Sequence, residues 1–184
     1  MKRLLTLLVA IVAIPALASN AAPLGMEIGV ATLAQVKQQI GSKTKLVDTG
    51  VNKFTGGPML ESDGQGLEVE GLSTITLIFD SKEKLAGVVM QLPKKEGFGD
   101  MKNGFFKKTL KALSGKYKLV EKREPFVGDA YAKLKQDDSI IELDAPHMSF
   151  TMELRYMTNE LKKTFVQQSA SNKSSKERNQ ASKL

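Results

Sequence analysis

The chain has 184 residues, of which 41% are hydrophobic and 26% are charged, and its formal net charge at pH 7 is +7. It contains no cysteine and one histidine, which excludes disulfide bonds, thiol nucleophiles and zinc sites built on thiolates. Six of the 27 basic residues lie in the terminal segments 1–21 and 167–184, so the region between them carries 21 basic and 19 acidic residues. This near-neutral balance predicts no nucleic-acid partner.

Residues 1–21 have the pattern of a secretory signal peptide. Two basic residues precede an apolar run over residues 4–14, and Pro15 followed by small residues ends that run. The spacing of the alanines predicts cleavage after Ala18 or after Ala21. The run has about half of the roughly 20 residues that cross a bilayer, and no later stretch approaches that length. We therefore expect an exported periplasmic protein without a membrane span.

The first predicted helix begins after Thr32, which has a side chain suited to an N-cap. Gln35 stands at the spacing of a capping box, in which each side chain binds the backbone N–H of the other residue. Val36 and Ile40 fall on one apolar face, and Gly41 is expected to end the helix in the left-handed conformation. The pattern predicts a short amphipathic helix.

Alternating apolar and polar residues predict the strands of the first half. The alternation is present in residues 67–71, 75–79 and 85–92, and favours a half-buried antiparallel sheet. Segments 55–58 and 62–66 are rich in glycine and polar residues, so we expect loops there.

The second half begins with another predicted helix. Phe106, Leu110 and Leu113 mark its apolar face, and Ser114 and Gly115 mark its end. Four alternating segments follow and predict strands over residues 117–122, 130–135, 139–143 and 149–156.

The last predicted helix is capped near Thr158 or Asn159 and is held by Leu161 and Phe165. Residues 167–184 are mostly serine, asparagine, glutamine and lysine. Such a segment buries too little apolar surface to offset the entropy of ordering, so we expect a disordered basic tail.

Residues 22–166 are therefore expected to form one α+β domain, an antiparallel sheet with helices packed on one face. Residues 43–47 and 116–120 have similar sequences, and each segment follows a predicted helix. This echo favours two tandem repeats, 29–92 and 100–157, each with a helix and about three strands. A chance likeness between similar hairpins stays open.

The first third of the expected mature chain also contains a recognisable spacing of glycine, threonine, apolar and aspartate residues: Gly29, Thr32, Val36, Ile40, Gly41, Phe79, Asp80 and Leu85. In this spacing it resembles the opening helix and hairpin of the small outer-membrane-assembly lipoprotein family, and the related architecture of tandem-repeat β-lactamase inhibitor proteins. The resemblance implies helices on one face of an antiparallel sheet and a function in binding other proteins. The lipid-carrying cysteine of that family is missing here.

Few residues have the chemistry of a catalytic site. His147 stands alone in a predicted turn, and one imidazole forms neither a triad nor a metal cluster without well-placed partners. Acidic residues gather in a loop and strand and in a hairpin turn: Glu61, Asp63, Glu68, Glu70, Asp137 and Asp138. Paired carboxylates suit glycoside hydrolysis, so an envelope hydrolase is an alternative function. Glu68 and Glu70 are expected to face solvent, and we predict no catalytic residue, metal or cofactor.

Five lysines on and after the second helix are the candidate partner-binding residues: Lys107, Lys108, Lys111, Lys116 and Lys118. They form either a solvated helix face or a patch for an acidic partner. The main functional prediction is a non-enzymatic, periplasmic protein-binding module with another envelope protein as partner.

A second alternative is a carrier that holds an apolar ligand between helices and sheet. Methionine side chains adapt to irregular ligands, and six of them would provide the lining: Met26, Met90, Met101, Met148, Met152 and Met157. Ordinary core packing explains the same residues.

Overall fold

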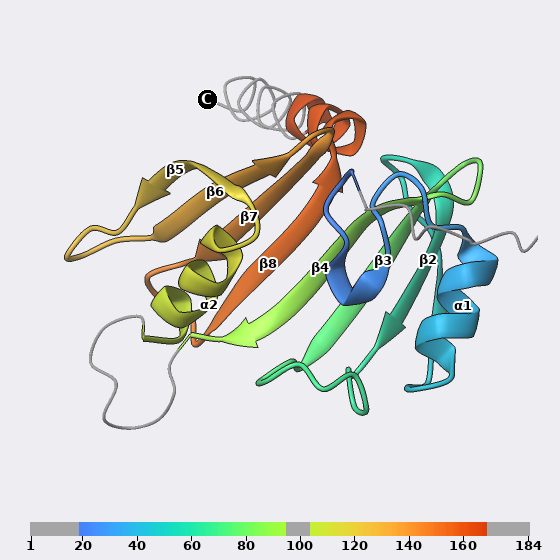
Figure 1. Ribbon diagram of the computed structural model, residues 1–184, viewed down its shortest axis with the longest axis horizontal. Helices are drawn as coiled ribbons and strands as arrows, with labels where there is room; N and C mark the ends of the chain where they lie inside the picture. The colour runs from blue at the N-terminus through green and yellow to red at the C-terminus, as the bar shows by residue number, and fades with distance from the viewer. Residues whose placement is uncertain (1–18, 95–103, 169–184) are drawn as a thin grey trace, which may run out of the picture.

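The computed structural model describes residues 19–94 and 104–168 and contains one eight-stranded antiparallel sheet (Figure 1). The sheet confirms the α+β class with an antiparallel sheet. A helix over residues 159–168 follows the last strand. The other elements, in chain order, are η1 (Pro23–Gly25), α1 (Leu33–Gly41), β1 (Val47–Val51), β2 (Gly56–Ser62), β3 (Thr74–Asp80), β4 (Leu85–Pro93), α2 (Gly104–Ser114), β5 (Lys118–Arg123), β6 (Ala130–Gln136), β7 (Ser139–Ala145) and β8 (Thr151–Thr158).

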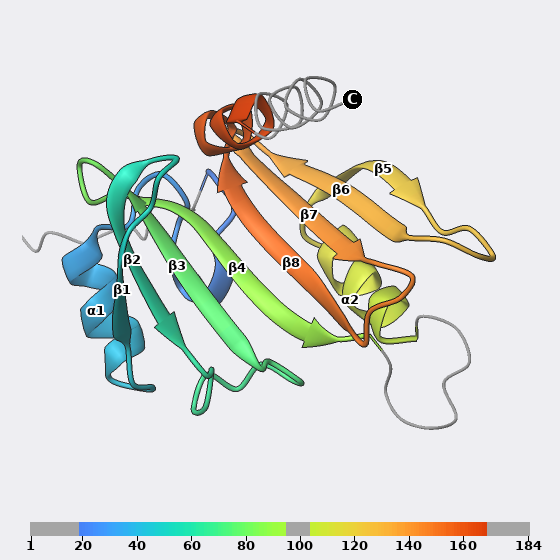
Figure 2. The ribbon, with the colours of Figure 1, turned by 180° about the vertical axis from the view of Figure 1, so that it is seen from behind.

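The strand order is β1-β2-β3-β4-β8-β7-β6-β5, which reads as two meanders joined through their last strands. Strands β4 and β8 meet at the centre of the sheet, where Val89 lies opposite Arg155 (Figure 2). Helix α1 precedes the first meander and α2 precedes the second. Each meander has four strands, and β1 and β5 form the two edges of the sheet. The four strands of the second meander were predicted, whereas β1 and β2 of the first meander were not.

Helix α1 begins as predicted. The Thr32 hydroxyl accepts a hydrogen bond from the Gln35 backbone N–H, and the Thr32 N–H donates to the Gln35 side chain. The helix ends at Gly41, as predicted, but the expected left-handed conformation is wrong, because Gly41 belongs to the helix and the following Ser42 has a right-handed φ of −72°. The Ser42 hydroxyl donates to the backbone carbonyl of Gln39 and so satisfies one terminal acceptor without a left-handed residue.

Two segments of the first half differ from the sequence prediction. Residues 67–71 alternate in hydrophobicity but form turns rather than a strand, because Glu68 and Gly71 have positive φ angles of 54° and 71°. Gly57 was expected in a loop and instead lies within β2. A Cβ atom at Gly57 would lie 2.3 Å from the carbonyl oxygen of Phe79, so this close approach of β2 to β3 requires glycine.

One large core joins both helices to the sheet. Val36 of α1, Phe106 of α2, Leu77 of β3 and Leu143 of β7 are fully buried in the same cluster. In Figure 1, α2 crosses the second meander, where it contacts β6 and β7. Apolar residues at every second strand position face this core, which explains why period-two alternation predicted most strands.

The 159–168 helix contacts the sheet through a second, smaller core. The Leu161 N–H donates to the Thr158 hydroxyl, which confirms the predicted cap, and the helix continues two residues into the expected tail. This core consists of Ala86, Met157 and Leu161, with Phe54 and Ile78 packed against it.

The expected signal peptide up to residue 18, residues 95–103 with Met101, and the expected tail from residue 169 lie outside the described residues. Within the described ranges, each helix is too short or too polar to cross a bilayer.

Candidate functional site

The face of the sheet that lies opposite the large core is called the second face here. A row of mostly polar side chains crosses it. In register order the row contains Thr76, Val89, Arg155, Glu142 and Lys133, from β3, β4, β8, β7 and β6. Opposite charges stand directly across from each other in Arg155, Glu142 and Lys133, an arrangement that stabilises neighbouring strands.

Glu142 is the most buried member of this row, with only 3% of its side chain exposed. The Tyr131 hydroxyl and the Lys162 ammonium each donate a hydrogen bond of 2.8 Å to its carboxylate. Burial, followed by the bond to Glu142, raises the pKa of the Tyr131 phenol well above its ordinary value. Lys162 belongs to the 159–168 helix, so this ion pair fastens the helix to the sheet.

Arg155 pairs with the other carboxylates of the second face, those of Glu153 and Asp144. Its Nε donates to Glu153 Oε2 at 2.7 Å, and its Nη2 contacts Glu153 and lies 3.5 Å from Asp144 Oδ2. The Gln91 amide donates to the remaining Glu153 oxygen at 2.8 Å. The carboxylates of Glu153 and Asp144 are therefore bound by neighbouring side chains. Among residues 19–94 and 104–168, no group of three or more acidic or histidine side chains is arranged to hold a metal ion.

A cavity of about 400 Å³ lies between this network and the 159–168 helix. The apolar part of its lining consists of Phe54, Ile78, Val89, Met157, Leu161 and Phe165, and the polar part of Asn52, Glu142, Glu153 and Arg155. The rings of Phe54 and Phe165 lie 5.4 Å apart, so they connect the β1–β2 hairpin to the helix.

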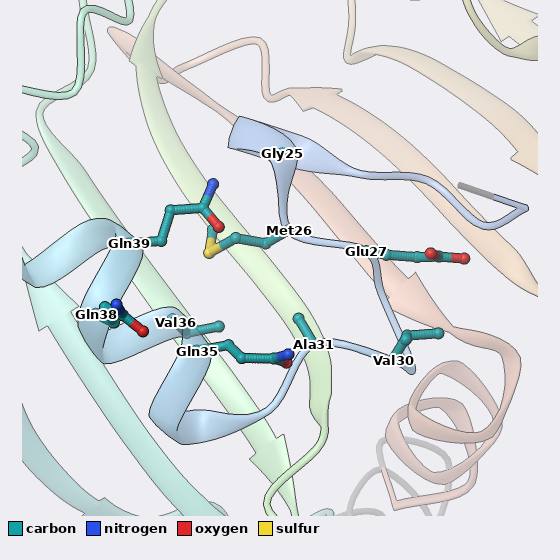
Figure 3. A pocket seen from close by; sticks show the side chains of 9 residues that line it. All are labelled: Gly25, Met26, Glu27, Val30, Ala31, Gln35, Val36, Gln38 and Gln39. Atoms are coloured by element: carbon teal, nitrogen blue, oxygen red, sulfur yellow. The ribbon is translucent and has the colours of Figure 1, made fainter. Parts of the chain in front are cut away.

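A second groove, of about 470 Å³, lies between α1 and the segment that contains η1 (Figure 3). Glu27 points away from the α1 side chains, and its carboxylate accepts hydrogen bonds from the Asn20 and Ser19 backbone N–H groups. The Gln39 amide donates to the Leu24 carbonyl at 2.8 Å. Because these polar groups serve the local fold, the groove presents no cluster of groups directed at a ligand.

Two neighbouring loops of the second meander expose large apolar side chains. Phe126 and Val127, in the loop 124–129, are 83% and 67% exposed. Met148 and Phe150, in the loop 146–150, are 92% and 87% exposed. We call these residues the apolar loops. Exposed apolar side chains that gather in one patch are typical of interaction sites, so the apolar loops are a candidate contact surface.

Both apolar loops are anchored by specific hydrogen bonds. The His147 backbone N–H donates to Asp129 Oδ1 at 2.7 Å, which ties one loop to the other. The Lys94 ammonium donates to the carbonyls of Pro146 and His147 at 2.6 and 3.2 Å. These bonds hold the backbone in place while the apolar side chains face outward, which lowers the entropy lost on binding.

The base of the loop 124–129 is fixed by charge. Lys107 of α2 and Lys122 of β5 lie 3.4 and 2.9 Å from the carboxylate of Glu124. The hydrogen bond from Lys122, followed by that from Lys107, lowers the pKa of the Glu124 carboxyl below its ordinary value.

The five candidate lysines are all exposed, but they are not gathered into one patch. Lys107 lies beside the loop 124–129 through Glu124, and Lys108 pairs with Glu70 at 3.0 Å. Lys118 stands at the opposite end of β5 from that loop, directly across from Lys135. The structure therefore associates only Lys107 directly with the apolar loops.

The residues proposed for a hydrolase are dispersed. His147 is exposed, and its backbone rather than its ring carries the bond to Asp129. Glu68 and Glu70 are exposed in the turn region before β3, whereas Asp137 and Asp138 form the β6–β7 turn. The carboxylates that the structure does bring together are Glu142, Asp144 and Glu153, which the sequence reasoning did not select.

The proposed methionine lining is also divided. Met26, Met90 and Met152 belong to the large core, and Met157 alone among the six lines the cavity on the second face. Met148 is exposed in an apolar loop, and Met101 lies outside the described residues.

A sequence signal for the missed loop residues was present. Phe126 and Val127 stand between Pro125 and Gly128, so apolar residues fall where turn chemistry places an exposed loop. A signal for Glu142 was present as well, since it interrupts the apolar strand between Ile141 and Leu143. Its partners Arg155 and Lys162 become neighbours only through strand register and the position of the last helix.

Neither a protein-family model, nor a curated protein, nor a solved structure matches this chain. The resemblance to small outer-membrane-assembly lipoproteins stays a prediction.

Proposed function

We propose that the protein is an exported, non-enzymatic binding module that docks on another envelope protein through the apolar loops. The exposure of Phe126, Val127, Met148 and Phe150 is the observation that carries this proposal. Exposed aromatic side chains on fixed loops are typical anchors of protein interfaces, because they bury a large apolar area on binding. The bound carboxylates of the second face favour contact over catalysis.

The candidate lysines indicate which charge to expect on the surface of the proposed partner. Lys107 stands beside an apolar loop, and Lys111 is exposed on the same helix four residues later. A basic flank next to apolar anchors fits a partner surface with acidic residues around an apolar centre. Lys118 lies at the other end of β5, so the proposed contact does not include it.

The proposal includes the tandem architecture with α1 and α2 on one face of the sheet, whereas the 159–168 helix packs against the second face. Each half consists of a helix and a four-stranded meander, and the strand order is the same from either edge. Residues 89–92 (VMQL) and 151–154 (TMEL) are also similar in sequence, and their methionines and leucines, Met90, Leu92, Met152 and Leu154, are buried in the same core. A duplicated unit that pairs through its last strand accounts for both features.

Site-directed photocrosslinking in cells tests the docking surface. A benzophenone amino acid at Met148 is expected to form a discrete adduct with an envelope protein, and the same amino acid at exposed Lys82, in the β3–β4 turn, is the matched control. Replacing Phe126 and Phe150 with Ser in the Met148 background is expected to abolish the adduct. Both side chains are exposed, so these changes leave stability within about 0.5 kcal/mol. Equal adducts from both positions, or an adduct that survives the serine substitutions, would refute the proposal.

A further inference from the structure

The cavity on the second face has the dimensions of a small-molecule site. Its volume of about 400 Å³ lies within the range of roughly 300–1,000 Å³ found for ligand pockets. Val89 and Ile78 line it from the sheet, Met157 and Leu161 contribute buried side chains, and Phe54 closes one side. A ligand body in this space would contact aliphatic and aromatic groups.

The polar end of the cavity has hydrogen-bond donors to spare. Arg155 uses Nε and Nη2 on Glu153 and Asp144, whereas its Nη1 lies 4.0 Å from Glu142 Oε2, beyond hydrogen-bond distance. Within the described part of the chain, Nη1 therefore keeps its two N–H groups for another acceptor.

Asn52 supplies a second donor. Its side-chain oxygen accepts from the backbone N–H groups of Phe54 and Thr55, so the orientation of the amide is fixed. Its Nδ2 donates to the Met59 sulfur at 3.1 Å, and a thioether is a weak acceptor. An oxygen acceptor on a ligand is a better partner for this buried N–H group.

Acceptors, in contrast, are occupied. Both Glu142 oxygens accept from Lys162 or Tyr131, and both Glu153 oxygens accept from Gln91 or Arg155. A carboxylate oxygen can accept more than one hydrogen bond, but each of these oxygens already has a close donor, whereas the Arg155 Nη1 donors have no acceptor within hydrogen-bond distance among the described residues. The unused donors therefore favour a ligand that carries an acceptor.

The local charge does not favour an anion. Glu142, Asp144 and Glu153 carry three negative charges, and Arg155, Lys162 and Lys133 carry three positive ones, so these side chains have no net charge. A carboxylate or sulfonate that entered this apolar cavity would lose its hydration without a net positive charge to replace it. A neutral carbonyl or hydroxyl oxygen does not bear this penalty.

We propose that this cavity binds an uncharged amphipathic ligand, with an apolar body between Phe54, Val89 and Leu161 and one oxygen acceptor directed at Arg155 Nη1. The site is distinct from the apolar loops, because Glu153, Arg155 and Met157 line it along β8 and it continues to the 159–168 helix, whereas the loop 146–150 precedes β8. Ligand binding is therefore a further activity, independent of the proposed docking function.

Two fluorescent probes test the charge selectivity. Prodan is an uncharged naphthalene ketone, and anilinonaphthalene sulfonate is an anionic dye of similar size. The full mature protein is expected to bind prodan saturably with a blue shift, and to bind the sulfonate at least about tenfold more weakly. Equal or tighter binding of the sulfonate would overturn the proposal.

Two substitutions test the location. Val89→Phe fills the floor of the cavity and is expected to weaken prodan binding by about tenfold or more, whereas Val120→Phe on the exposed edge strand β5 leaves it unchanged. Arg155→Lys keeps the charge beside Glu153 but removes the Nη1 donors. Arg155→Lys is expected to weaken prodan binding by about tenfold. It should weaken the binding of phenylnaphthylamine, a neutral dye without a carbonyl, much less.

Methyl NMR of the unsubstituted protein gives a readout that needs no variant. Prodan is expected to shift the methyl resonances of Ile78, Val89, Met157 and Leu161, and to leave that of Met148 unmoved. Unperturbed Val89 and Met157 methyls at saturating prodan, or prodan binding that Val89→Phe does not weaken in a folded variant, would overturn the proposal.

Discussion

Removing the buried carboxylate of Glu142 is expected to destabilise the protein strongly. Glu142→Ala leaves the Lys162 ammonium and the Tyr131 hydroxyl without the acceptor that they share at 2.8 Å. Breaking a buried ion pair by removing one partner costs about 3–5 kcal/mol. Lys162 and Arg155 are 22% and 24% exposed and can recover some hydration, so we expect a loss of about 3 kcal/mol, at the lower end of that range. For a domain of this size, this corresponds to a fall in Tm of about 6–12 °C.

Urea denaturation followed by circular dichroism measures this free energy of unfolding. Glu121→Ala is the matched control, because Glu121 is an acid on the edge strand β5, two strands from β7, and pairs with Arg123 in solvent. Exposed pairs contribute about 0.2–1 kcal/mol. Lys162→Ala and the double variant with Glu142→Ala complete a cycle, and the double variant is expected to lose less than the sum of the single changes by about 1 kcal/mol or more.

The prediction is contradicted if Glu142→Ala lowers the free energy of unfolding by no more than Glu121→Ala does. It is also contradicted if the effects of Glu142→Ala and Lys162→Ala are additive. Either result would mean that water, rather than Lys162, solvates the carboxylate. Glu142→Gln separates charge from geometry, since the amide oxygen still accepts from Tyr131 and Lys162. We expect the free energy of unfolding of Glu142→Gln to lie between that of the wild type and that of Glu142→Ala.

Two further predictions concern titration and export. Burial raises the pKa of all three phenols, Tyr117, Tyr131 and Tyr156, so the unfolded state loses these protons first and the free energy of unfolding falls as pH rises above the ordinary tyrosine value of about 10. Absorbance titration should show the phenols of the folded protein ionising above the ordinary value of about 10, and a tyrosine that ionises near pH 10 in a native spectrum would contradict this. N-terminal sequencing of exported protein should give Ser19, because Ala21 is fully buried and its N–H donates to Ser139; a start after Ala21 would contradict it.

The predictable part of the fold is the part controlled by local chemistry. The capping box of Thr32 and Gln35 is satisfied by neighbours three residues apart, so the sequence alone locates the start of α1. Strands such as β3 and β8 alternate because one face is buried, and that alternation survives in any register.

The unpredicted part depends on contacts between distant segments. Gly57 looks like a turn residue, yet it lies in β2 because the strand approaches the Phe79 carbonyl closely. Residues 67–71 look like a strand, yet positive φ angles at Glu68 and Gly71 turn the chain. In each case the backbone conformation is selected by tertiary packing, which propensity and alternation do not contain.

The same distinction applies to the candidate sites. The exposed Phe126 follows from its place between turn residues, so the apolar loops could be found by reading the sequence for apolar residues in turns. The cavity could not be found in this way, because Phe54, Val89 and Phe165 come together only when the 159–168 helix folds onto the sheet. Its polar end needs the register that sets Glu142 opposite Arg155.

Strand β8 connects the two proposed activities. The loop 146–150 ends where β8 begins, and the 159–168 helix starts where β8 ends. Val89 lies opposite Arg155, four residues after the start of β8, so at about 3.3 Å per residue roughly 13 Å of strand separates it from that start. A protein bound at Phe150 and a small ligand beside Val89 therefore occupy different parts of the same sheet. Because β8 is central and paired on both sides, it is also the rigid element through which occupation of one end could bias the other, and such coupling would be reciprocal in the two affinities.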